Sequence, residues 1–373
     1  MQPLIVTSVT IVIFYCAYKI TKANKLKRLF LFYSIYLAIL GFLFKPDIAY
    51  DLYMHYGYLD NARRYGLTYL QTTGKTIGLP TYQYLFYLFS KFPVDNFLGM
   101  FTAFVINYFP LMVIYHYGKD HMMYKRDIML IAVLFLCSQN YIALVSNVRT
   151  PITYALFVYV FYYENKNKRL RLLAVFIYFV LVFLHPSILL PIGLRYIFII
   201  PRKKIQRFLL ILLLGSFAMI PYFISYSKGK TGLIGYMGSF LYEYIYDTER
   251  NMHNIQANLT YTLRMITTGG IILYILFFRY IQIKGRRSNI HEYVFLGIAL
   301  VMISSLGSSY HFFLRYASLL QMMIAFPMCT ILTTHFKNRR NFATFTRVIS
   351  LLALISNFVL QYRMAEFAVY LFK

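Results

Sequence analysis

Long apolar stretches restrict the fold of this 373-residue chain more than any other feature. A helix that crosses a bilayer core of about 30 Å needs about 17–25 mostly apolar residues. Several stretches are short, with Pro or Gly near their ends. We expect an all-α, polytopic transmembrane helix bundle of about 12 spans, near 3–18, 29–44, 95–116, 128–145, 149–163, 170–184, 187–200, 208–226, 258–281, 291–307, 313–333 and 342–360.

Composition supports a membrane protein. Of all residues, 60% are hydrophobic and 13% are charged, whereas a soluble domain carries about 25% charged residues. These values exclude a soluble globule, a coiled coil and a disordered chain. Cys16, Cys137 and Cys329 all lie in apolar stretches, so we expect neither a disulfide framework nor a zinc site. No metal or cofactor motif stands out, and we expect no cofactor.

The net charge of +26 follows a topological pattern. Six loops, separated by even numbers of expected spans, hold 24 of the 38 basic residues. The positive-inside rule makes these loops cytoplasmic and both termini external. The charge therefore indicates a lipid bilayer as partner and no nucleic acid. The first span lacks a basic segment before it and is expected to be an anchor, not a cleaved signal peptide. We expect one integral membrane domain, 1–373.

Two expected outer loops are long, at 45–94 and 227–257. The first is rich in tyrosine and acidic residues, and it ends in a segment, 80–92, that begins with Pro80. About 12 helical residues span only about 18 Å, which is too short to cross the bilayer. We interpret this segment as a re-entrant or interfacial helix, and we expect any chemistry to face outward.

Four ionisable residues at outer helix ends are candidates for binding an anion: Arg149, His185, Arg264 and Arg315. Ionisable groups at membrane depth are costly, and they normally face a cavity or a partner. Guanidinium groups match phosphate oxygens bidentately. The arginines could instead bond backbone carbonyls, and Arg264 could extend to the interface. We expect Arg149, Arg315 and Arg264 to bind a phosphate-bearing ligand.

Acid–base candidates lie on the same outer side. Asp51 and His55 are four residues apart and share a face if the segment is helical. Asp51 could be a general base, and His55 and His185 are the alternatives. The tyrosines could stack on sugar rings or could form only an interfacial aromatic belt. The weaker candidates for contacting sugar are Asp47, Tyr53, Tyr56 and His311.

In order along the chain, these motifs resemble one family. Asp-Leu-x-x-His-Tyr (51–56), a Pro-led helix at Pro80, Asn-x-Arg (147–149), Leu-His-Pro-Ser (184–187) and Arg-Tyr (315–316) resemble the EpsG/Wzy-type polysaccharide polymerases. The resemblance covers roughly 45–330. That family usually has Arg-Gln where Arg149 and Thr150 stand here, and Asp47 competes with Asp51 for the acidic position.

The resemblance implies a GT-C-like, metal-independent membrane glycosyltransferase. Such enzymes polymerise undecaprenyl-pyrophosphate-linked oligosaccharide repeat units into capsular polysaccharide or exopolysaccharide at the outer face of the bacterial plasma membrane. Arginines take the place of a divalent ion on the pyrophosphate. Chain-length regulators and a flippase are the partners expected for the family.

Two other functions remain open. A lipid-linked oligosaccharide flippase would also suit many spans, although transporters usually carry charges near the midplane and helices broken in corresponding positions. A single-addition GT-C glycosyltransferase or ligase would share the chemistry but would add one unit only. The outer-end charges and the long tyrosine-rich loop favour an enzyme.

Overall fold

The computed structural model describes residues 2–22, 25–46, 50–72, 78–200, 258–282, 289–305, 310–333 and 339–366, together with 204–205, 208, 211–212, 215, 220–227 and 242. Within these ranges the chain is helical and contains no β-strand. The fold is therefore all-α, as predicted. Apart from Ser227 and Tyr242, the second long loop, 227–257, lies outside the described residues.

The first half of the chain forms α1 (Gln2–Ile20), α2 (Leu26–Leu43), α3 (Asp51–Thr72), α4 (Pro80–Ser90), α5 (Asn96–Asp120), α6 (Lys125–Ser138), α7 (Tyr141–Ser146), α8 (Arg149–Lys166), η2 (Lys168–Leu170) and α9 (Arg171–Leu184). The second half forms η3 (Pro186–Ile188), α10 (Leu189–Ile199), α12 (Ile220–Ser227), α15 (Asn258–Leu276), η4 (Phe277–Gln282), α16 (Ile290–Ser304), α17 (Tyr310–Met322), α18 (Ala325–Thr333) and α19 (Arg339–Glu366).

The expectation of about 12 spans is wrong. Among the described residues, three helices are long and apolar enough to cross a membrane, at Leu26–Leu43, Asn96–Asp120 and Asn341–Val359. A fourth span results if α17 and α18, which are bent by 47° at their junction, are counted as one. Other apolar segments form shorter helices, such as α9 with 14 residues and α10 with 11. The helices are consistent with an α-helical membrane protein.

Local sequence explains why apolar stretches end early. Pro186 disfavours a helical conformation for the residue before it, and His185 is accordingly extended, with φ −155° and ψ 116°. Pro327 lies in the first turn of α18, where its ring would clash with the carbonyl of Met323 in a continuous helix. The helices on both sides of Pro186 are therefore too short to cross a bilayer, although each had been counted as a span.

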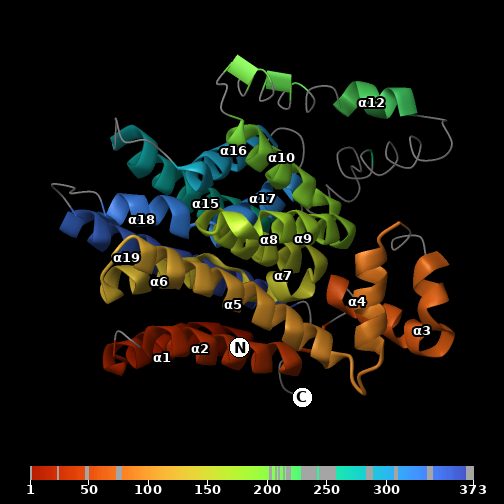
Figure 1. Ribbon diagram of the computed structural model, residues 1–373. Coiled ribbons are helices and arrows are strands. Elements are labelled where there is room, and N and C mark those ends of the chain that lie inside the picture. The colour runs from red at the N-terminus through yellow and green to blue at the C-terminus, as the bar shows by residue number, and fades with distance from the viewer. Residues whose placement is uncertain are drawn as a thin grey trace.

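Residues 51–90 form a helical hairpin and not an open loop. The predicted segment 80–92 is confirmed as a helix, α4, with Pro80 at its first position, where a missing N–H costs nothing. Helix α3 bends at Gly66, whose φ of +74° is readily adopted only by glycine. The hairpin projects at one end of the bundle (Figure 1), and α4 contacts α9.

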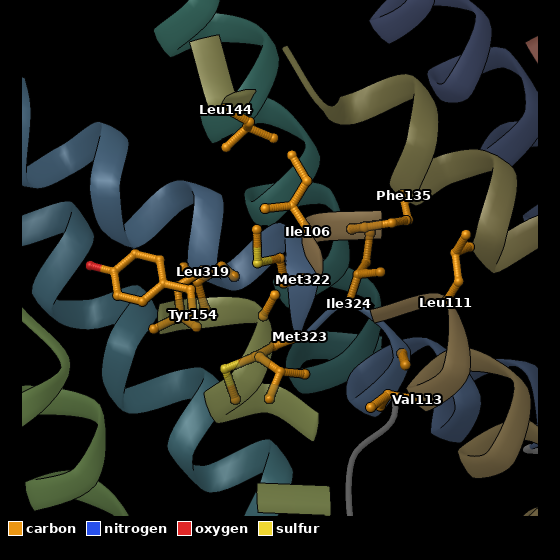
Figure 2. Close-up of a cluster of buried hydrophobic side chains, with 14 of the residues drawn as sticks. Ile106, Leu111, Val113, Phe135, Leu144, Tyr154, Leu319, Met322, Met323 and Ile324 are labelled. Atoms are coloured by element: carbon orange, nitrogen blue, oxygen red, sulfur yellow. The ribbon is translucent and has the colours of Figure 1, made fainter. Parts of the chain in front are cut away.

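The remaining helices pack in layers. Helix α2 lies along α5, which contacts α8, and α8 contacts α9 and α17 (Figure 1). Between them lies a core of fully buried side chains from α5, α6, α8 and the bend between α17 and α18 (Figure 2). Ile106, Phe135, Tyr154, Met323 and Ile324 belong to this core. This core lies where α8 packs against α17.

Helices α2 and α5 cross at two glycines. A Cβ added at Gly41 would lie 2.7 Å from the carbonyl oxygen of Gly99, and one added at Gly99 would lie 2.7 Å from that of Gly41. Both contacts are closer than real Cβ atoms approach, and both are with backbone. Small residues allow such close backbone approach between membrane helices.

We therefore expect Gly99→Ala to lower the free energy of unfolding by about 1–3 kcal/mol, because overpacking forces the helices apart. Gly57→Ala is the matched control, since a Cβ there meets nothing within 4 Å. Alanine favours a helix over glycine by up to about 1 kcal/mol. Thermal unfolding of purified protein in detergent measures both. Equal stability of wild type and Gly99→Ala would contradict this packing.

Candidate functional site

The helical hairpin brings His55 against α4. The hydroxyl of Tyr82 lies 3.3 Å from Nδ1 of His55, and the imidazole packs edge-on against Phe86 and Tyr82. The side chain of His55 is only 2% exposed. His55 therefore lies behind Tyr82 and supports that ring. This position suits a structural role better than the base role expected as an alternative.

Arg149 lies on the other side of Tyr82. Its guanidinium carbon is 4.7 Å from the centroid of the Tyr82 ring, within the range of a cation–π interaction. Arg149 is also the first residue of α8, where unpaired backbone N–H groups favour anions. Among the described residues it forms no ion pair with a carboxylate. Its positive charge therefore stays available to a ligand.

Asp51 faces the same tyrosines. It is the exposed first residue of α3, and it has no ion pair in the described ranges. Burial raises the pKa of Tyr82; the charge of Arg149 opposes that rise and the charge of Asp51 adds to it. Both charges act on Tyr58 in the same way. The charges of Asp51 and Arg149 thus act in opposite directions on Tyr58 and Tyr82.

His185 is the second centre of the site. It occupies the break between α9 and η3, outside every helix long enough to span a membrane. Its Nδ1 lies 2.7 Å from Oγ of Ser187 and accepts from the backbone N–H of the same residue at 3.2 Å. The Tyr154 hydroxyl, from α8, donates to Oγ of Ser187 at 3.0 Å. A short chain of hydrogen bonds thus leads from the core to the imidazole.

Arg315 is the second arginine whose charge acts on His185. It lies in α17, and its charge acts on both His185 and the Tyr154 hydroxyl. Burial lowers the pKa of His185 well below 6.5, and the charges of Arg315 and Arg149 lower it further. Both predicted arginines therefore lie near one neutral imidazole, although 166 positions separate them in the sequence. Two guanidinium groups and a helix N-terminus can together bind a doubly charged anion.

Other predicted residues lie elsewhere. Tyr53 is 49% exposed on α3. Tyr56 turns toward α5, where its buried hydroxyl lies near Gly99 and lacks a hydrogen-bond partner in the described part of the chain. Asp47 lies outside the described residues, as do the side chains of Arg264 in α15 and His311 in α17.

Arg63 has a structural role. It pairs with Asp60 and Asp95 and donates from Nε to the Ser90 carbonyl at 3.0 Å. These bonds tie α3 to the end of α4 and to the start of α5. Arg64, its neighbour, is exposed and provides a useful control.

Three site residues were not among the sequence candidates: Tyr82, Tyr154 and Ser187. Ser187 lay within the Leu-His-Pro-Ser motif, and a hydroxyl two residues after a histidine signals a local side-chain hydrogen bond. Tyr82 lay in the Pro-led helix among several aromatic residues. Tyr154 lay within an apolar stretch with no distinguishing signal.

Within the described ranges, no three His, Cys, Asp or Glu side chains come close enough together to hold a metal ion. The three cysteines are free thiols. Comparison of the chain with protein-family models, curated proteins and solved structures yields no match. Asp51, Arg149, His185 and Arg315 are therefore the residues from which we infer a function.

The depressed pKa of His185 predicts a pH effect on stability. The unfolded imidazole takes up a proton near pH 6.5 and the folded one only well below, so this contribution is present above pH 6.5 and is lost as pH falls. At pH 5.5 the loss is up to about 1.4 kcal/mol. Thermal unfolding at pH 7.5 and 5.5 should show a smaller pH difference for His185→Gln than for wild type. An identical difference would contradict the buried, neutral state.

Proposed function

We propose that the protein polymerises undecaprenyl-pyrophosphate-linked oligosaccharide repeat units into a capsular polysaccharide or exopolysaccharide, at the outer face of the bacterial plasma membrane. The observation that carries the proposal is that the charges of Arg149 and Arg315 both act on one buried histidine, His185. Asp51 acts on Tyr82, the ring that contacts Arg149. Arg149, which forms no ion pair with a carboxylate among the described residues, suits a pyrophosphate. The apolar helices are compatible with a lipid-linked substrate.

The proposed reaction transfers a glycan between two lipid carriers. The hydroxyl oxygen of the acceptor sugar attacks the anomeric carbon of the donor and forms a new glycosidic bond. The bond from that carbon to the pyrophosphate oxygen breaks, and the pyrophosphate leaves on its lipid with the electron pair. The acceptor proton passes to the Asp51 carboxylate. Arg149 and Arg315 stabilise the negative charge that develops on the leaving group, which is usually the largest catalytic contribution.

Substitution of the arginines tests the pyrophosphate role. We expect Arg149→Ala and Arg315→Ala each to slow chain elongation by about 10²-fold or more, since each removes a preorganised cation. The elongation rate of Arg149→Lys should lie between those of wild type and Arg149→Ala, because lysine keeps the charge but loses the bidentate geometry. The assay uses purified full-length protein in nanodiscs with the lipid-linked repeat unit, and product length is read on gels.

Arg64→Ala is the matched control for these variants. Arg64 is exposed on α3, so its loss removes one positive charge outside the site and should leave elongation unchanged. Thermal unfolding separates lost catalysis from lost folding. Near-normal elongation by folded Arg149→Ala and Arg315→Ala would refute the pyrophosphate role.

Asp51→Asn tests the proposed base. A positioned base typically contributes 10²–10⁴-fold to the rate, so we expect kcat to fall by about that factor while KM for the donor changes little. Asp60→Asn is the control, because Asp60 is an exposed carboxylate that pairs with Arg63 on the same helix. If Asp51→Asn retains the full rate, the base is another group.

Broken helices favour the flippase as the second candidate. Helices α17 and α18 form a bent pair. Helix α6 ends at Ser138, and α7 begins at Tyr141 after a short break. A pocket between these breaks is lined by Ser138, Asn140, Leu144, Thr268, Leu314, Ser318, Gln321 and Asn357. Transporters use such interrupted helices at substrate sites. In cells lacking the protein, single lipid-linked units outside would support a polymerase, whereas units trapped inside would support a flippase.

Product length separates polymerisation from a single addition. A GT-C glycosyltransferase or ligase of the single-addition kind would stop after one unit in the nanodisc assay. A ladder of products that lengthens with time would favour polymerisation.

A further inference from the structure

The hydrogen bonds of His185 fix the position of its proton. A backbone N–H can only donate, so the bond from the Ser187 N–H requires an unprotonated Nδ1. The Ser187 hydroxyl accepts from the Tyr154 hydroxyl, and it is therefore free to donate its own hydrogen to Nδ1. The backbone bond therefore assigns Nδ1 as an acceptor, and the contact with the Ser187 hydroxyl is compatible with that assignment.

The imidazole is also neutral. It is 8% exposed, and the positive charges of Arg149 and Arg315 oppose a third one beside them. A neutral imidazole carries one hydrogen. With Nδ1 excluded, that hydrogen is on Nε2. Among the described residues, Nε2 has no hydrogen-bond partner, so its N–H is available to a ligand.

We propose that His185 is a fixed Nε2–H donor to the anionic group bound by Arg149 and Arg315, and not a general base. This inference rests on the proposed function and specifies a third contact to the pyrophosphate. A protonated Nε2 cannot accept the proton of an acceptor sugar, which leaves Asp51 for that step. A neutral donor adds a hydrogen bond to the anion without adding a repelling charge beside the two arginines.

The surrounding residues hold this donor in place. Pro186 imposes the extended conformation of His185, and Tyr154 is fully buried in α8. The hydrogen-bond chain from Tyr154 through Ser187 sets the orientation of the ring. A donor that is oriented before the ligand arrives needs no reorganisation during the reaction.

Nitrogen NMR tests the tautomer directly. Full-length protein with ¹⁵N-labelled histidine is placed in nanodiscs, and the His185→Gln spectrum identifies the His185 signals. We expect an unprotonated Nδ1 and a protonated Nε2 from pH 7.5 to 5.5. A proton on Nδ1, or a doubly protonated ring at pH 6, would overturn the inference whatever the enzyme's activity.

Binding of inorganic pyrophosphate tests the contact. We expect His185→Leu to weaken binding about tenfold, since a hydrogen bond to a charged group is lost. His185→Gln should bind nearly as well as wild type, because its amide N–H replaces Nε2–H. It should also keep most of the chain elongation activity. If His185 were a base, Gln would be as inactive as Leu in elongation, and this result would refute the donor role.

The same experiment separates this inference from the proposed function. If Arg149→Ala binds pyrophosphate as tightly as wild type, the anion site itself is refuted. If Arg149→Ala loses binding while folded His185→Leu retains it, only the role of His185 is refuted. The NMR measurement on wild type remains decisive if His185→Leu does not fold.

Discussion

The contact between Arg149 and the ring of Tyr82 connects the hairpin of α3 and α4 to the bundle. An aromatic face positions a cation without neutralising it, in contrast to a carboxylate. The arginine is thereby oriented at the first turn of α8 and keeps its full charge. Tyr82 is in turn supported by His55. The hairpin thus positions the site although few of its own side chains carry charge there.

Buried charges elsewhere in the bundle form ion pairs. Glu164 of α8 bonds Arg195 of α10, and Tyr178 of α9 donates to the same carboxylate at 2.9 Å. Arg279 and Glu292 form a second buried pair. Each buried charge is thus paired with an opposite one, although Nη1 of Arg195 has no hydrogen-bond partner among the described residues. The charges of Asp51 and Arg149 act on the same tyrosines, yet neither residue forms an ion pair within the described ranges. This contrast makes the two residues candidates for a site.

The all-α fold was predicted from the apolar sequence, whereas the roles of the candidate site residues stay predictions. Arg149, His185 and Arg315 were chosen because ionisable groups in apolar sequence are costly, and the folded chain brings these three together. Tyr82 and Tyr154 were not chosen, because their roles depend on how α4 and α8 pack against other helices. Such packing leaves no local pattern in the sequence. The span count was wrong because short apolar segments, such as 170–184 and 187–200, were counted as spans, although the helices they form, α9 with 14 residues and α10 with 11, are too short to cross a bilayer.

The pair between Glu164 and Arg195 also links three helices to one another. Either ion alone in apolar surroundings would cost several kcal/mol. Glu164 belongs to α8, Arg195 to α10, and the Tyr178 hydroxyl of α9 donates to the same carboxylate. The cluster is complete only when all three helices are packed together, so the packing of each helix depends on the other two.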